Sequence, residues 1–110
     1  MNLYKGVIVE NSLNDRKILD EVRIVKKYKD ENWVLYEIEI MEDNIKDLQK
    51  YINDGPWYIH LWRENNDKVY VVFKDNIFKI KYSDKSTWGK AIDYGKKMGI
   101  PEKQLDFLIN

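Results

Sequence analysis

Apolar and polar side chains alternate along much of the first half of the chain, as they do in strands with one buried face. The short apolar run at residues 7–9 predicts a first strand over residues 5–10, and a second strand is predicted over residues 22–28. The clearest alternation covers residues 33–41, where the predicted inner face consists of Val34, Tyr36, Ile38 and Ile40. Three predicted strands therefore come before any helix.

Two later stretches carry apolar residues at the spacing of an amphipathic helix. The first covers residues 43–53, and Gly55 and Pro56 end it, since glycine adopts the left-handed conformation after a last turn and proline cannot continue a helix. The second begins at a capping serine, at position 83 or 86, and runs to about Met98. Its apolar stripe contains Trp88, Ala91, Ile92, Gly95 and Met98. We expect each helix to follow a set of strands.

Between the helices, residues 57–82 predict three antiparallel strands joined by turns at Asn65-Asn66 and Asp75-Asn76. The predicted order of elements is βββαβββα over a single domain of 110 residues. This order predicts the α+β class, with a mostly antiparallel sheet and two helices packed on one face.

The strand predicted at residues 57–63 contains two of the four tryptophans and the only histidine. Its faces depend on the length of the loop that follows, since a shift of one residue in register moves every side chain to the other face. A two-residue loop pairs Trp62 with Val69 and His60 with Val71. In that register His60 points toward the core.

A three-residue loop instead pairs Leu61 with Val71 and directs the aliphatic residues of the strand into the core. It leaves four ring side chains on the outer face, namely Tyr58, His60, Trp62 and Tyr70. We favour this second register because it buries aliphatic groups and pairs Glu64 with Lys68, whereas the first register buries an imidazole, whose polar atoms then need hydrogen bonds.

The exposed rings of the favoured register form a candidate binding surface, because large aromatic groups in contact on a small protein mark sites of binding or association. The candidate binding residues are Tyr58, His60, Trp62, Arg63 and Tyr70. We expect the two tyrosines and Trp62 to provide stacking or apolar contact, His60 a hydrogen bond, and Arg63 a charge for an anionic group or a partner's carboxylate. No residue is assigned a catalytic role.

Composition narrows the classes of function. Nineteen basic and nineteen acidic residues cancel, so the chain has no overall field that would attract phosphate backbones, acidic substrates or anionic lipid. The absence of cysteine fits a reducing compartment and a cytoplasmic location, and no apolar run approaches the roughly 20 residues that span a bilayer. With one histidine and no calcium-loop spacing, we expect no metal site and no cofactor.

A small enzyme is the alternative from another class, with His60 as its general base. The nearest carboxylate along the strand, Glu64, is about 13 Å away, so an orienting partner would have to be Glu37 or Glu39 from a neighbouring strand. The sequence contains no nucleophile motif and no glycine loop for phosphate. We therefore expect His60 to pack or to face water rather than to catalyse.

Binding of single-stranded nucleic acid is a further alternative. Lys74, Lys79 and Lys81 fall on the sheet face that carries the aromatic side chains in the favoured register, and rings flanked by lysines can stack bases and contact phosphates. The zero net charge and the presence of only three arginines disfavour this function.

Self-association uses the same aromatic face, or the stripe of Trp33 and Leu35 on the outer side of the third strand. Burial of either surface in a two-fold contact predicts a homodimer. The sequence leaves open whether a small ligand or another protein also binds.

Four segments carry a resemblance to a known family: residues 5–13, the Trp57-Tyr58 strand, residues 72–80, and the closing stretch Tyr94-Gly95-x-x-x-Gly99-Ile100-Pro101-Glu102-x-Gln104-Leu105-Asp106-Phe107. In these segments the chain resembles, over nearly its whole length, a family of small prokaryotic proteins with no assigned activity. The Gly-Ile-Pro-Glu-x-Gln-Leu-Asp-Phe segment is the most specific part. The resemblance implies a stand-alone intracellular domain and transfers no catalytic or binding residues.

Overall fold

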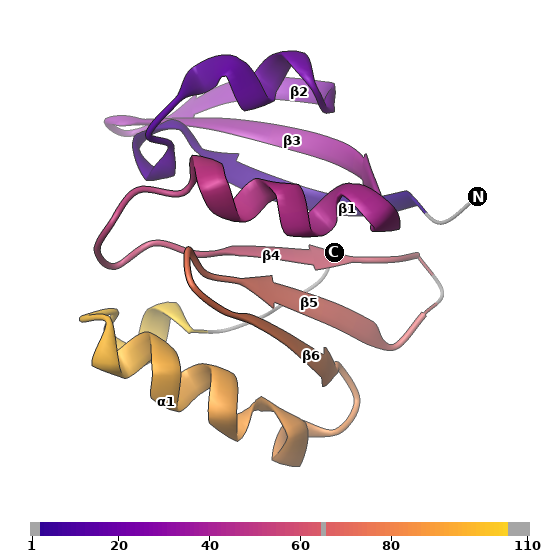
Figure 1. The fold of residues 1–110 in the computed structure, drawn as a ribbon, viewed down its shortest axis with the longest axis vertical. Coiled ribbons are helices and arrows are strands. Elements are labelled where there is room, and N and C mark those ends of the chain that lie inside the picture. Colours follow the sequence, from indigo (N-terminus) through magenta and orange to yellow (C-terminus); the bar gives the residue numbers. More distant parts are fainter. Residues whose placement is uncertain (1–2, 65, 106–110) are drawn as a thin grey trace.

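The computed structural model describes residues 3–64 and 66–105. Its centre is a six-stranded antiparallel sheet with the order β2-β3-β1-β4-β5-β6 (Figure 1). The strands are β1 (Leu3–Val9), β2 (Arg23–Asp30), β3 (Trp33–Met41), β4 (Ile59–Trp62), β5 (Lys68–Val72) and β6 (Ile77–Lys81). Strand β1 lies between the β2–β3 hairpin and the β4–β5–β6 meander and joins them into one sheet.

The helical segments of the described residues are η1 (Glu10–Ser12), η2 (Arg16–Asp20), η3 (Glu42–Tyr51), η4 (Lys85–Trp88), α1 (Gly89–Lys97) and η5 (Glu102–Gln104). Helix η3, wound as a 3₁₀ helix, and helix α1 correspond to the two predicted helices. Gly99, at a φ of 91°, follows α1 in the left-handed region, as expected. The cap before η4 is Asp84 rather than a serine, because its carboxylate accepts a hydrogen bond from the backbone N–H of Ser86.

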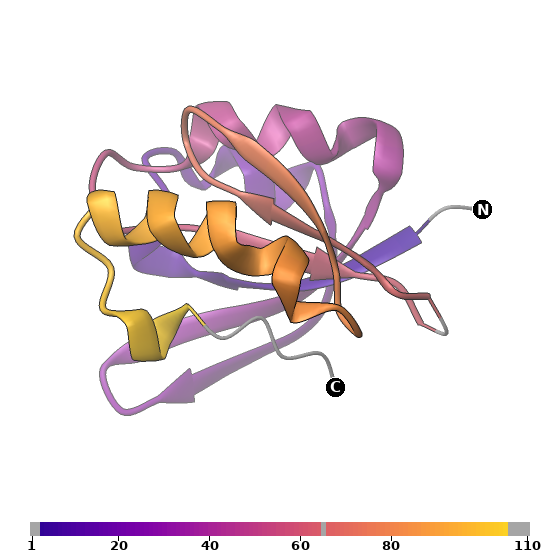
Figure 2. The ribbon, with the colours of Figure 1, turned by 90° about the horizontal axis from the view of Figure 1, so that it is seen from below.

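The sheet is covered on both faces. Helix η3 packs on one face, the η3 side, where Ile45 and Leu48 are buried. Helix α1 packs on the other face, the α1 side, where Ala91 is buried with Val69 and Val71. Figure 2 shows the two helices on opposite sides of the meander. The α+β class, the antiparallel sheet and the order of elements are confirmed, but the expectation that both helices share one face is wrong.

The pairing of β4 with β5 also differs from the favoured one. Trp62 pairs with Val69 and His60 with Val71, which is the register of the two-residue loop. Asn65, in the predicted turn, lies outside the described residues. The three-residue register that we favoured from the sequence is therefore wrong.

The reason is that β4 and β5 are buried on both sides. Ile59 and Leu61 point to the η3 side, whereas Val69 and Val71 point to the α1 side, and all four are at most 1% exposed. The sequence argument assumed a single buried face, so it placed both aliphatic pairs in the same layer. Two cores, one on each side of the sheet, remove that requirement.

Helix α1 covers only part of its side of the sheet. The residues buried with it come from β5, the turn after β5, β6, η4 and the segment after the helix, which contributes Ile100 and Leu105. None of the residues in this buried cluster comes from β1, β2 or β3, and the side chains of Val7, Val9 and Leu35 on the same face are half-buried. This difference creates the surface described next.

Candidate functional site

Three of the predicted binding residues form a row of rings along β4 and the residue before it, on the α1 side. His60 lies between Tyr58 and Trp62, with ring centroids 6.1 Å and 5.3 Å away and interplanar angles of 35° and 31°. All three side chains are half-buried. The Tyr58 hydroxyl donates a hydrogen bond of 2.5 Å to the backbone carbonyl of Gln104, which attaches the row to the segment after α1. The row forms one wall of the site.

Tyr70 and Arg63 lie on the η3 side instead. Tyr70 pairs with Leu61, whose side chain is buried in the core under η3. The guanidinium of Arg63 lies 5.9 Å from the ring centroid of Tyr4, which belongs to the same core. The five candidate residues therefore do not share one face, because the register of β4 and β5 separates these two from the row of rings.

Tyr70 is part of a cluster around Glu42, the first residue of η3. Glu42 accepts hydrogen bonds from the Tyr70 hydroxyl at 2.5 Å, and from the Tyr4 hydroxyl and Lys68 Nζ at 3.2 Å each. The hydrogen bond from Tyr70, followed by that from Lys68, lowers the pKa of Glu42 from 4.5 to about 2. Burial, followed by the bond to Glu42, raises the pKa of Tyr70 from 10.0 to about 12. Such a carboxylate is a poor base, and the cluster acts as a clamp between η3, β1 and β5.

Beside the row on β4, the α1 side is hollowed over β1, β3 and β2. Strand pairing places Lys5 opposite Trp62 and Val7 opposite Glu37, and paired residues share a face. We call this surface the aromatic groove, and it is formed by Val7, Val9, Tyr28, Trp33, Leu35, Glu37, Trp57, Tyr58, His60 and Trp62. The groove consists of two adjoining hollows that share Val7.

The larger hollow has a volume of about 590 Å³ and extends from the row on β4 to the end of the β2–β3 hairpin. Its lining includes Val9, Asp30, Trp33, Leu35, Trp57, Tyr58 and His60. Trp33 and Trp57 pack edge to face, with ring centroids 6.0 Å apart and an interplanar angle of 72°. Trp33 is 42% exposed, so a large apolar ring remains accessible at this end.

The smaller hollow has a volume of about 310 Å³ and lies at the Trp62 end of the groove. Its lining includes Lys5, Gly6, Val7, Val25, Tyr28, Glu37, Glu39 and Trp62. A β-bulge in β2 shapes it, because the pairing shifts between Ile24 and Lys26 and leaves Val25 as the extra residue. The bulge reverses the faces of the residues that follow and turns Tyr28 to the α1 side.

Several charges near the smaller hollow have partners. Arg23 pairs with Glu39 at 3.4 Å, and Lys5 pairs with Glu64 at 3.5 Å. The basic side chains of both pairs are well exposed, so each pair contributes about 0–1 kcal/mol. These contacts orient the side chains around the hollow more than they stabilise the fold.

The groups that line the groove, among the described residues, bear on whether His60 has a nucleophile or a carboxylate beside it. The side chains that line the two hollows include no serine, threonine or cysteine to act as a nucleophile. Glu37 and Glu39 lie on β3, and β1 separates β3 from β4, so their backbones are about 10 Å from that of His60. The sheet therefore does not bring either carboxylate next to the imidazole to orient it.

Two further features of the described residues bear on chemistry. Residues 3–64 and 66–105 contain no group of three or more histidine, cysteine, aspartate or glutamate side chains that could hold a metal ion. Within the same residues, no helix is both long enough and apolar enough to cross a membrane.

The lysines considered for nucleic-acid binding do not flank the row on β4. Lys79 pairs with Tyr70, and its ammonium lies 5.6 Å from the Tyr70 ring centroid on the η3 side. Lys74 forms an ion pair with Asp54 at 2.7 Å. Lysines and β4 rings share one face only in the three-residue register, and β4 and β5 pair in the two-residue register instead.

Sequence reasoning found one wall of the groove but missed most of its floor. The stripe of Trp33 and Leu35 was identified as a surface for association, yet nothing local indicated that it lies beside the row on β4. Tyr28 was not singled out, because the bulge at Val25 breaks the alternation expected for residues 22–28. A usable signal was the apolar run at residues 7–9, because neighbouring residues of a strand point to opposite faces and such a run therefore places apolar side chains on both.

Comparison of the chain with models of protein families, with curated proteins and with solved structures finds no match. The resemblance to a family of small prokaryotic proteins therefore stays a prediction. Function has to be argued from the aromatic groove itself.

Proposed function

We propose that this protein is a non-catalytic binding or self-association module, and that the aromatic groove is its contact surface. The observation that carries the proposal is the position of three of the four tryptophans, Trp33, Trp57 and Trp62, around two adjoining hollows. Indole rings combine a large apolar area with one polar N–H, and aromatic residues are enriched where proteins bind partners.

The residues predicted from the sequence keep their roles in part. Tyr58 and Trp62 provide apolar or stacking contact along one wall, and His60 provides a hydrogen bond between them. Tyr70 belongs to the cluster around Glu42, and Arg63 lies against the Tyr4 ring. The proposal therefore assigns neither residue a contact in the groove.

The dimensions of the groove support a small ligand or a side chain from a second copy of the chain. Ligand pockets commonly have volumes of about 300–1,000 Å³, and the two hollows, at about 310 Å³ and about 590 Å³, fall in that range. A cytoplasmic location is part of the proposal, supported by the absence of cysteine.

Sedimentation velocity over a range of protein concentrations tests the self-association form of the proposal. We expect the wild-type chain to form dimers as its concentration rises, and Trp62→Ser to shift the chain toward the monomer. Ile24→Ser is the matched control, since Ile24 is 40% exposed but points to the η3 side. A wild-type chain that stays monomeric at high micromolar concentration rules out the homodimer and leaves the groove as a site for a ligand.

A further inference from the structure

Glu37 occupies an unusual position on the floor of the smaller hollow. It is half-buried in β3, opposite Val7 on β1 and opposite Lys26 on β2. Within residues 3–64 and 66–105, its carboxylate forms neither a hydrogen bond nor an ion pair. A charged group that loses part of its hydration without gaining a partner costs free energy in the folded chain.

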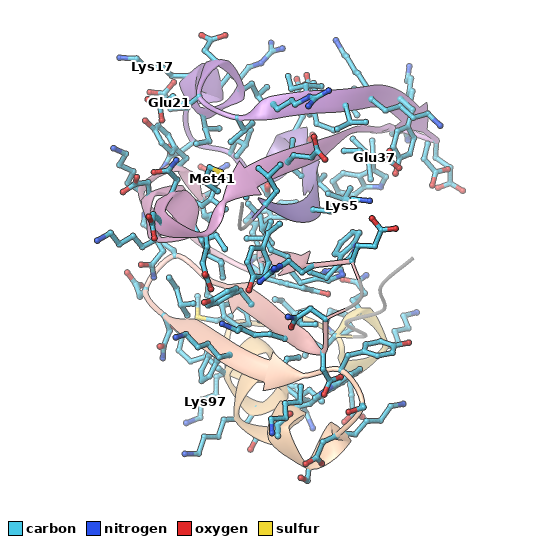
Figure 3. All side chains as sticks on the ribbon, turned by 90° about the vertical axis from the view of Figure 1, so that its right-hand side faces the viewer. Lys5, Lys17, Glu21, Glu37, Met41 and Lys97 are labelled. Atoms are coloured by element: carbon cyan, nitrogen blue, oxygen red, sulfur yellow. The ribbon has the colours of Figure 1, made fainter. Side chains whose placement is uncertain are left out.

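The two lysines nearest to Glu37 along the strands make other contacts rather than an ion pair with it. Lys26, directly across from Glu37, has its ammonium 5.3 Å from the Tyr28 ring centroid. Lys5, two residues from Val7, forms an ion pair with Glu64 at 3.5 Å. Figure 3 shows Glu37 and Lys5 on the side of the sheet that faces away from η3. The negative charge of Glu37 is therefore left facing the hollow.

The same hollow is walled by two aromatic rings, those of Tyr28 and Trp62. The faces of aromatic rings attract cations, and tryptophan does so most strongly. The Lys26 ammonium already lies over the Tyr28 ring, so the Trp62 ring is the one that remains for a ligand. A carboxylate and an indole ring in one hollow combine the two features that bind organic cations. The other carboxylate of the hollow, Glu39, already forms an ion pair with Arg23, so Glu37 is the carboxylate that remains for a ligand.

We propose that the smaller hollow binds the ammonium group of a small organic cation, whose apolar body extends over Val7 into the larger hollow. This inference rests on the proposed function and adds the chemical class of the ligand. The apolar body would contact Leu35 and the rings of Trp33 and Trp57. A free small molecule fits better than an inorganic ion, because a single carboxylate provides too few oxygen ligands for a metal.

Three probes with the same aromatic body and different head groups test the inference: 2-phenylethylammonium, 2-phenylethanol and 3-phenylpropanoate. Each is titrated into the full chain while amide and indole N–H resonances are followed by NMR. We expect the ammonium probe to bind roughly ten-fold more tightly than the alcohol, because a hydrogen bond between charged groups contributes more binding free energy than one from a neutral hydroxyl. We expect the carboxylate probe to bind most weakly, and the Trp62 indole resonance to shift.

Glu37→Gln removes the charge while keeping the shape of the side chain. It should reduce the affinity for the ammonium probe roughly ten-fold, to that of the alcohol, and leave the affinity for the alcohol unchanged. Asp93→Asn, on the exposed face of α1, removes one negative charge outside the groove and should change neither affinity. Trp62→Leu should weaken the binding of both probes.

The outcomes separate the inference from the proposed function. If the three probes shift groove resonances equally, or if ammonium binding survives Glu37→Gln, the charge inference is overturned while the groove still stands as a binding surface. If no probe shifts any groove resonance, the inference is overturned as well. If the wild-type chain is then also monomeric in sedimentation, the proposed function falls with it.

Discussion

The two halves of the α1 side carry similar apolar side chains in different environments. In the β4–β5–β6 half, Val69, Val71 and Phe73 are at most 1% exposed and lie in the same buried cluster as α1. In the β2–β3–β1 half, Val7 and Leu35 stand on the same face and are only half-buried. The first half is a core, and the second is a surface that combines apolar side chains with the charged groups of Lys5, Glu37 and Glu39.

This difference indicates that the β2–β3–β1 half does not use Val7 and Leu35 to build a core. The β2–β3–β1 half already has a core on the η3 side, where Ile8, Ile38 and Ile40 are buried. Its side chains on the α1 side contribute less to the free energy of folding, because hydrophobic stabilisation scales with the apolar area removed from water. Apolar area that folding leaves half-exposed can contribute to a contact made afterwards.

The largest expected effect comes from deleting a ring in the covered half. Phe73 packs with its ring centroid 4.8 Å from that of Tyr94 and 5.9 Å from that of Phe78. Phe73→Ala leaves a cavity beneath α1 and should lower the free energy of unfolding by about 3–5 kcal/mol. Leu35→Ala in the groove should cost only about 1 kcal/mol, because that side chain remains partly in water. Urea unfolding followed by circular dichroism measures both, and equal costs would mean that the groove is part of the core.

An intermediate effect is expected at the junction of the two halves, where β1 pairs with β4. A Cβ on Gly6 would press on the Cδ2 atom of Leu61 and lie 3.1 Å from the backbone oxygen of His60. Gly6→Ala should therefore lower the free energy of unfolding by about 1–3 kcal/mol, since overpacking forces neighbours to move. Gly89→Ala is the control, because nothing lies within 4 Å of a Cβ there. Similar unfolding midpoints for the two variants would contradict a tight junction.

The smallest effect concerns the η3 side, where hydrogen bonds hold a charge in place. The pKa of Glu42 is lowered from 4.5 to about 2, so its ionised form stabilises the fold above about pH 4.5, and that contribution disappears as the pH falls toward 2. In Glu42→Gln, the free energy of unfolding should fall less steeply as the pH is lowered from about 4.5 toward 2. Tyr70→Phe, which removes the strongest donor to Glu42, should shift the loss to higher pH. Urea midpoints measured between about pH 5 and about pH 2.5 test this, and an unchanged slope in Glu42→Gln would refute it.

Much of the secondary structure was predictable from the sequence because the signals are local. The alternation in residues 33–41, the stripe around Leu48 and the glycine at position 99 each depend on neighbours within a few residues. The uninterrupted apolar run at residues 69–73 is typical of a strand buried on both faces, and this signal could have corrected the preference for one buried face.

The placement of the candidate residues was predicted only in part. Tyr58, His60 and Trp62 share a face because they alternate along one strand, and the sequence predicted this correctly. Their relation to Tyr70 depends on the pairing of two strands, where a change of one residue reverses the result. Alternation within a strand is a local property, whereas pairing between strands is not.

By itself, the sequence determined which segments form strands and helices, which residues alternate along each strand, and that the charges of the chain balance. Only the tertiary structure decided that η3 and α1 take opposite faces, that a bulge at Val25 turns Tyr28 into the groove, and that Glu37 is left facing a hollow between aromatic rings. The physical reason is that these features arise from contacts between residues distant in the chain, and each is selected by how well two whole surfaces pack together.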